Sequence, residues 1–271
     1  MTASVITERP AAAPVFGRFA GLRSLVRKDT TEWMRGRRTW VVFIIATLWT
    51  VLAAANAWII MQARSLLPAD VEPENLPVTL APMDNLMAGF GSQVFVLAAV
   101  FAVASLIVRE RESGTLAWVA SKPVSREGIW LSKWLSSSVM LAVAAVVAPL
   151  VLTVAAVVAM YGMPDLGAVA IVGLGGVAAV VFYAALGLAA GTVLPGQPAI
   201  VAVGLAAFAL VPALLGLIPL PLAQYLPTSI VGWSVGAAMG VDVGWVTPVA
   251  WAVGTALVVG FGVRRMNRIE L

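Results

Sequence analysis

Long apolar stretches without charged residues alternate with short polar segments along this chain of 271 residues. A helix needs roughly 20 apolar residues to cross a bilayer, because each residue rises about 1.5 Å through a hydrocarbon core about 30 Å thick. Six stretches meet this requirement, and they lack the strict alternation of membrane-barrel strands. The pattern therefore predicts a bundle of six spanning helices. Their approximate bounds are 40–61, 86–108, 134–160, 166–193, 199–222 and 243–263.

The composition also indicates a membrane protein. Hydrophobic residues make up 61% of the chain and charged residues only 11%, and the mean hydropathy is +0.97. Soluble domains carry about 25% charged residues. We therefore expect an all-α polytopic membrane protein, with a disordered Ala- and Pro-rich leader over 1–14 and a single membrane domain over 15–271.

The distribution of basic residues predicts the orientation. Of the 17 Lys and Arg residues, all but Arg64 precede the first span, lie between the second and third spans, or follow the sixth. Six spans put these three segments on one side, and Lys and Arg favour the cytoplasmic side. Both termini are therefore expected in the cytoplasm. The first outer loop carries the acidic residues Asp70, Glu72, Glu74 and Asp84.

The segment before the first span has apolar residues at helical spacing and basic residues over much of its remaining surface. The apolar positions are Val15, Phe19, Leu22, Val26, Trp33 and Trp40. We expect an amphipathic helix that lies in the inner headgroup layer and leads into the first span. The alternative is a solvated basic leader that only sets the topology.

The segment 224–245 is apolar enough to suggest a seventh span. A seventh span would place Arg264, Arg265 and Arg268 outside, so we expect instead a re-entrant or surface-lying outer segment that begins near Pro227. Glycines recur here at a spacing of four, which places them on one helical face open to close approach by another backbone. The alternative is that small residues are simply common in membrane helices. The expected packing glycines are Gly187, Gly191, Gly232, Gly236, Gly240 and Gly244.

The loop between the second and third spans contains signals for three successive helices. The second span is expected to continue through Glu112, and Gly114 can end it because glycine tolerates a positive φ. A short helix is expected over Thr115–Ser121, with Leu116 and Val119 on its apolar side.

The end of this short helix and the start of the following helix also have local causes. Pro123 prevents continuation of the short helix, and Ser125 is expected to cap the following one, with Glu127 near its positive end. A short helix held between two longer ones has a shape suited to docking a partner. The alternative is an ordinary charged loop that obeys the positive-inside rule.

Missing residue types exclude several kinds of chemistry. The chain has no Cys and no His, which removes disulfides, thiolate sites, the commonest metal ligand and the commonest general base. A P-loop needs Lys after Gly, and none of Lys28, Lys122 and Lys133 follows a glycine. No predicted span contains an acid or a base, which disfavours proton coupling and intramembrane catalysis. We expect no catalytic residue, cofactor or metal in this chain.

The loop reads Glu-Arg-Glu-Ser-Gly-Thr-Leu (110–116) and Ser-Lys-Pro-Val-Ser-Arg (121–126), and Lys133 follows in the next helix. This string resembles the cytoplasmic loop of type-2 ABC permeases, the single-domain membrane subunits of bacterial ABC exporters, including those linked to nitrous oxide reductase maturation. The resemblance implies that the loop is a coupling helix that sits in the cleft of a separate ATPase dimer. It also implies that the leader is the family's connecting helix. The implied coupling residues are Arg109, Glu110, Arg111, Glu112, Gly114, Thr115, Leu116, Val119, Lys122, Pro123 and Arg126.

The resemblance further implies a location and partners. The permease would be a homodimer, or would pair with a related permease, in the bacterial inner membrane, and the ATPase chain would bind ATP and Mg. The family's second ATPase contact falls between spans four and five, where this chain has the uncharged turn 194–198. Within the coupling loop we expect Glu112 to pair with a basic group of the ATPase. Leu116 and Val119 would fill an apolar hollow there.

Three functions are compatible with these observations. The first is the permease subunit of an ABC exporter, with apolar spans that suit a hydrophobic or amphipathic substrate. The second is a membrane scaffold or sensor subunit that transports nothing and docks a cytosolic partner through the same loop. The third is a secondary transporter. Flux that depends on ATP would separate the first function from the other two.

Overall fold

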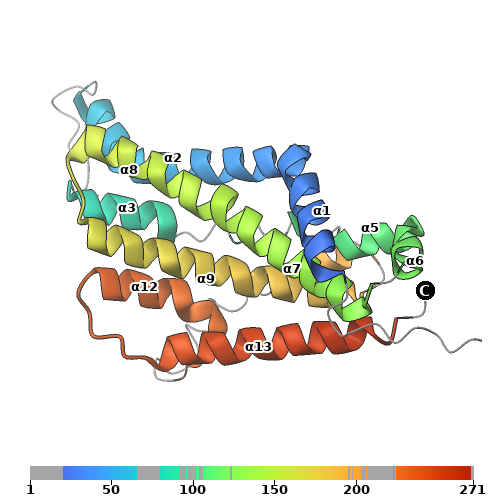
Figure 1. Cartoon of the computed structure of the whole chain (residues 1–271). Helices are drawn as coiled ribbons and strands as arrows, with labels where there is room; N and C mark the ends of the chain where they lie inside the picture. The colour runs from blue at the N-terminus through green and yellow to red at the C-terminus, as the bar shows by residue number, and fades with distance from the viewer. Residues whose placement is uncertain are drawn as a thin grey trace, which may run out of the picture.

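The computed structural model describes residues 21–65, 80–91, 96, 100, 102–103, 106–122, 124–194, 196, 198–202, 206, 222 and 224–269. All of the regular structure in this part of the chain is helical, and most helices run side by side in one bundle (Figure 1). The helices are α1 (Leu22–Arg35), α2 (Arg37–Ser65), α3 (Pro82–Gly91), α5 (Leu106–Glu112), α6 (Thr115–Ala120), α7 (Arg126–Leu141), the π-helix η1 (Ala142–Val147), α8 (Ala148–Tyr161), α9 (Leu166–Gly191), the 3-10 helix η2 (Pro227–Ser229), α12 (Ile230–Ala238) and α13 (Val246–Met266).

Four of the predicted spans coincide with helices long and apolar enough to cross a membrane. These are Arg37–Ala63, Arg126–Tyr161, Leu166–Gly191 and Val246–Met266. The last begins slightly later than expected, because 243–244 precede α13 in an irregular segment. The predicted span 86–108 is described only in part, and most of 199–222 lies outside the described residues, so these two spans stay predictions.

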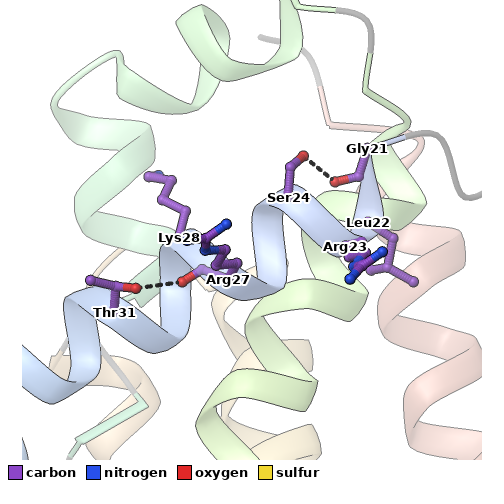
Figure 2. A pocket seen from close by; sticks show the side chains of 7 residues that line it. All are labelled: Gly21, Leu22, Arg23, Ser24, Arg27, Lys28 and Thr31. Carbon is purple, nitrogen blue, oxygen red and sulfur yellow. Dashed lines mark hydrogen bonds between the residues drawn. The ribbon is translucent and has the colours of Figure 1, made fainter.

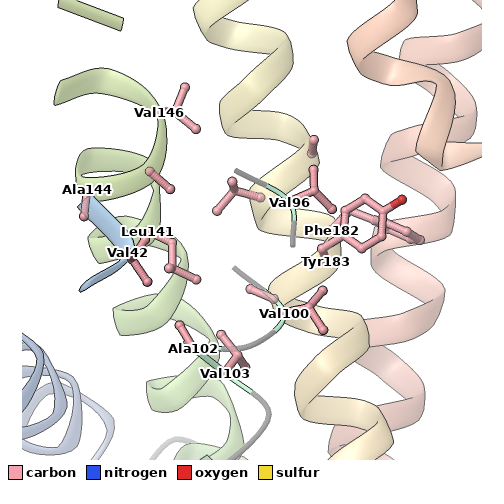
Figure 3. Close-up of a cluster of buried hydrophobic side chains, with 14 of the residues drawn as sticks. Val42, Val96, Val100, Ala102, Val103, Leu141, Ala144, Val146, Phe182 and Tyr183 are labelled. Carbon is pink, nitrogen blue, oxygen red and sulfur yellow. The ribbon is translucent and has the colours of Figure 1, made fainter. Parts of the chain in front are cut away.

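Helix α9 lies in the middle of the bundle and is the most buried of the four long segments. Two indole N–H groups fix its neighbours: Trp134 of α7 donates to the carbonyl of Val181 at 3.2 Å, and Trp251 of α13 donates to that of Ala178 at 2.8 Å. Figure 3 shows the core beside it, where buried apolar side chains of α9 lie in one cluster with side chains from α2, α7 and η1 and with Val96, Val100, Ala102 and Val103. The long helices are therefore held by apolar packing and by a few buried donors.

The third span is one helix interrupted by a π-helical turn. Pro149 has no N–H, and its ring would clash with the carbonyl four residues earlier in a regular helix. One extra residue is accommodated just before it, so the N–H of Ala148 donates to Val143, five residues back. Thr153 returns a hydrogen bond to the Pro149 carbonyl at 2.8 Å and contacts Thr50 of α2 at 2.9 Å. This irregular turn is buried against α2 and α9.

A tyrosine hydroxyl is inserted beside the backbone of α2. The hydroxyl of Tyr161, at the end of α8, accepts from the N–H of Trp58 at 2.7 Å and donates to the carbonyl of Ala54 at 3.1 Å. These two backbone groups are the i+4 and i partners that a regular helix joins directly. Tyr161 thus bridges one step of the helical ladder of α2.

The glycine pattern before the last span was interpreted wrongly. Helix α12 ends at Ala238, and Gly240 and Gly244 lie beyond it with φ of 75° and 59°. Those two glycines form the turn toward α13 because L-residues avoid such backbone angles. The four glycines therefore do not share a helical face. A Cβ added at Gly232 would meet nothing within 4 Å, whereas one at Gly236 would lie 2.8 Å from the Val243 side chain in the following segment.

Close helix contacts occur at other glycines. A Cβ at Gly175 of α9 would collide with Ser234 of α12, and one at Gly254 of α13 would collide with Pro227. The predicted pair in the fourth span also lies at a helix contact. A Cβ at Gly187 would lie 3.6 Å from Val103, and one at Gly191 would lie 3.5 Å from Ile107 and Ile200. α12 therefore packs along α9 and α13 as a short helix, in agreement with the expected helix start at Pro227.

Candidate docking site at one end of the bundle

Helices α5 and α6 project from the end of the bundle that also carries α1, the beginning of α7 and the end of α13 (Figure 1). The predicted boundaries are confirmed. α5 ends at Glu112, and Gly114 follows with a φ of 71°. Ser125 caps α7, since its hydroxyl accepts from the N–H of Gly128 at 2.9 Å. Local signals therefore place a one-and-a-half-turn helix, α6, at the tip of the molecule.

The side chains of α6 that are buried and those that are exposed differ from the expectation. Leu116 is 1% exposed and Val119 is 7% exposed, because both pack into the protein's own core. The assignment of these side chains to a hollow in a partner is therefore wrong. Trp118 instead is 61% exposed, and the Lys122 ammonium lies 3.5 Å from the centre of its ring. The free surface of α6 is an indole covered by a cation.

A cluster of charged side chains lies where α1, α2, α5 and α7 meet. The Lys133 ammonium of α7 pairs with the Glu110 carboxylate of α5 at 2.7 Å, and the two side chains are only 6% and 18% exposed. Asp29 of α1 accepts from the Ser132 hydroxyl at 2.8 Å. These groups border a cavity of about 10 Å³, room for about one water molecule. The cavity is lined by Asp29, Glu32, Trp33, Arg38, Leu106, Glu110, Lys133 and Ser136.

This charged cluster was not predicted from the sequence. Lys133 entered only as part of the loop string, and no role was expected for Asp29 or Ser132. Asp29 is an acid on an otherwise basic helix, and Ser132 precedes the lysine directly. Those features are visible in the sequence, but nothing in it shows that α1 and α7 pack together.

Two arginines of the predicted coupling loop bond to distant segments. The Arg111 guanidinium donates to the carbonyl of Leu194, in the turn after α9, at 3.0 Å. Arg126 donates to the carbonyl of Ile269, after α13, at 2.8 Å, and more weakly to that of Asn267 at 3.3 Å. The loop is thereby joined to the turn between spans four and five and to the end of the last span.

The other predicted coupling residues lie at the surface of this end or outside the description. Arg109 and Glu112 are exposed, and the Thr115 hydroxyl contacts that of Ser113 at 2.8 Å. Pro123 lies outside the described residues. Within those residues, no group of three or more His, Cys, Asp or Glu side chains is placed to hold a metal ion.

Helix α1 is a helix as predicted, but its apolar face is not free. Leu25, Asp29 and Trp33 form its buried line, and they pack against α7. The Trp33 ring is covered on one side by the Arg38 guanidinium, 4.4 Å from its centre. The apolar face of α1 therefore contacts protein, whereas the expectation from the sequence was that it would face lipid. Residues 15–20 of the expected helix lie outside the described part of the chain.

Comparison with known proteins adds a family relation to this geometry. The family model described as ABC-2 family transporter protein matches residues 23–253, which include α1, the projecting α5–α6 segment and most of the bundle. No curated protein matches the chain.

Proposed function

The chain belongs to the ABC-2 family of transporter proteins, and on this basis we propose that it is the permease subunit of an ABC exporter driven by a separate ATPase. Membership makes the chain a multi-pass membrane component of an ABC transporter and implies an ABC ATPase partner. Such components are generally not catalytic themselves. The proposal adds the direction of transport, the docking site and the way in which ATPase motion reaches the spans.

The docking site is the exposed face of α6, and Trp118 is its central side chain. Trp and Arg are the residues that most often dominate binding energy at protein interfaces, and they act from positions that become fully desolvated in the complex. Trp118 is the largest exposed apolar side chain of the projecting segment. Arg109 and Glu112 of the adjoining α5 are also exposed and offer charged groups of both signs. This exposed indole is the single observation that carries the proposal.

Movement of α6 would reach the spans through rigid contacts. Leu116 and Val119 fix α6 to the core, and the buried Glu110–Lys133 pair joins α5 to α7. A displaced contact transmits work only if the segments behind it move together, because packed interiors are not continuously deformable. Motion at α6 would therefore be passed to α7 and, through Arg111, to the turn after α9.

Several finer features of the proposal follow the family pattern. The chain would cross the bacterial inner membrane six times with both termini in the cytoplasm, and α12 would be a re-entrant outer helix. A second copy, or a related permease, would complete the transporter, and ATP and Mg would bind to the ATPase. The substrate would be hydrophobic or amphipathic, as the apolar helices suggest. The relation to permeases of nitrous oxide reductase maturation stays a prediction.

The test is Trp118→Ala, with Trp245→Ala as the matched control. Trp245 is 76% exposed and directly precedes α13, whose beginning lies at the opposite end of the bundle from α6 (Figure 1). Removing a central interface tryptophan costs about 2 kcal/mol or more, so ATPase affinity should fall about 30-fold or more. ATP-dependent efflux should fall with it, while detergent extraction and melting temperature stay unchanged.

Normal ATPase binding and efflux in Trp118→Ala would show that α6 is not the docking element. Normal binding of an ATPase without any ATP-dependent flux in the parent protein would favour the scaffold function instead. Leu116→Asp would not be a clean uncoupling variant, because it places a carboxylate in the core. We expect it to lower the stability of the permease itself by several kcal/mol.

A further inference from the structure

A groove of about 870 Å³ runs along the outer side of α1. Figure 2 shows its lining, in which the long side chains of Arg23, Arg27 and Lys28 extend from the helix surface. The two hydroxyls in the groove are turned back onto the backbone: Ser24 donates to Gly21 at 2.7 Å and Thr31 donates to Arg27 at 2.8 Å. The cations are therefore the main donors that a ligand in this groove would meet.

The acidic residues of α1 do not neutralise these cations. Asp29 is 6% exposed and is bonded to Ser132 on the inner side of the helix, and Glu32 pairs with Arg38 at 3.3 Å. Within the described part of the chain, Arg23 and Arg27 form no ion pair, and Lys28 reaches Asp29 only at 3.9 Å. The acids of α1 are thus engaged by Ser132 and Arg38, whereas Arg23 and Arg27 are exposed and have no acidic partner among the described residues.

The position of the groove indicates what kind of anion it meets. Helix α1 turns sharply from α2 at Gly36 and lies across the end of that spanning helix (Figure 1). Arg35 and Arg37 flank the turn and are exposed. A basic surface that runs transversely just beyond an apolar spanning segment lies at the depth of the lipid headgroups.

The lining of the groove also argues against a protein partner. Among the described residues that line it, Leu22 is the only large apolar side chain and none is aromatic. Protein interfaces generally need a desolvated apolar or aromatic centre, which α6 provides and this groove does not. Phosphodiester headgroups, in contrast, are bound by clustered Arg and Lys side chains without an apolar centre.

We propose that this groove is a binding site for the headgroup of an anionic phospholipid, held by Arg23, Arg27 and Lys28. The bound lipid would cover the outer side of α1 while α7 covers its inner side. The site uses only the position of α1 beside a spanning helix. It is therefore independent of export direction and of ATPase docking.

The test titrates the purified permease alone, in detergent, with dioctanoyl phosphatidylglycerol, and follows the bound lipid by native mass spectrometry. Each basic side chain near an anionic surface contributes about fivefold in affinity, so Arg23→Gln/Arg27→Gln/Lys28→Gln should bind about a hundredfold more weakly. Arg23→Lys/Arg27→Lys should retain most of the affinity. Rising salt should weaken binding to the parent protein and change binding to the triple variant much less.

The control is Arg265→Gln/Arg268→Gln, which removes exposed charges at the end of α13, outside the groove. Its lipid affinity should stay close to that of the parent. Dioctanoyl phosphatidylcholine should not compete, and neither should inorganic phosphate. Equal loss in this control, or equal binding of phosphatidylcholine or free phosphate, would overturn the proposal.

A protein partner gives a different result. If the triple variant keeps its phosphatidylglycerol affinity but no longer binds the ATPase, the groove is a protein contact and the lipid proposal is wrong. All three substituted residues are exposed, so we expect each variant to keep its fold. Size-exclusion profiles of each variant check this expectation.

Discussion

Lys133 and Glu110 form an ion pair whose two halves should not be equally costly to remove. The cavity beside them is lined by three acids, Asp29, Glu32 and Glu110, and two bases, Arg38 and Lys133. Lys133→Met leaves three carboxylates facing one guanidinium. Glu110→Gln leaves two charges of each sign and preserves a hydrogen-bond acceptor for the Lys133 ammonium.

The expected magnitudes follow from burial. Lys133 is 6% exposed and Glu110 is 18% exposed, so a charge left alone here is only partly solvated. Leaving a buried charge without its partner costs about 3–5 kcal/mol, which we expect for Lys133→Met. Weakening one buried hydrogen bond to a charged group costs about 1–3 kcal/mol, which we expect for Glu110→Gln. The double variant should cost less than the sum of the two single variants, because it leaves no unpaired partner.

The assay is thermal unfolding in detergent, followed by tryptophan fluorescence. At about 2–4 °C per kcal/mol, Lys133→Met should lower the melting temperature by about 6–20 °C and Glu110→Gln by clearly less. A matched substitution outside the cluster, Lys122→Met, removes an exposed charge and should change the melting temperature little. Equal shifts for the two single variants, or strictly additive costs in the double variant, would refute the charge imbalance as the cause.

Two further predictions concern packing and topology. Gly262→Ala should destabilise the protein by about 1–3 kcal/mol, because its new methyl group meets the Trp130 ring. Gly260→Ala in the same helix meets nothing within 4 Å and should be neutral or slightly stabilising. Comparable melting temperatures for the two variants would contradict the structure. Single cysteines in this cysteine-free chain should react with an impermeant reagent from outside at Ala69, and not at Ser4 or Asn267; labelling at Asn267 from outside would disprove cytoplasmic termini.

Boundaries set by local chemistry could be predicted from the sequence. Gly114 and Ser125 act through φ preference and a capping hydroxyl, and these effects depend on few neighbours. The end of α5 at Glu112 and the cap of α7 at Ser125 were accordingly correct. Four of the six long apolar runs are likewise helices long and apolar enough to span, and the other two stay predictions.

What each helix face contacts could not be predicted in the same way. The spacing of Leu116 and Val119 correctly placed them on one side of α6, but spacing does not say whether that side meets a partner or the chain's own core. The glycine spacing of four failed because Gly240 is a turn residue, and periodicity assumes that the helix continues. The contact between Asp29 and Ser132 joins residues 103 positions apart, and only the packing of α1 on α7 reveals it.

The hydroxyl of Tyr161 has a mechanical consequence for α2. A helix resists bending because a bend must stretch its hydrogen bonds. Where the hydroxyl joins the carbonyl of Ala54 to the N–H of Trp58, the gap between these groups can widen while each keeps a partner. We therefore expect α2 to bend more easily at this step than in a turn closed by direct hydrogen bonds, so that the part attached to α1 can tilt relative to the far end.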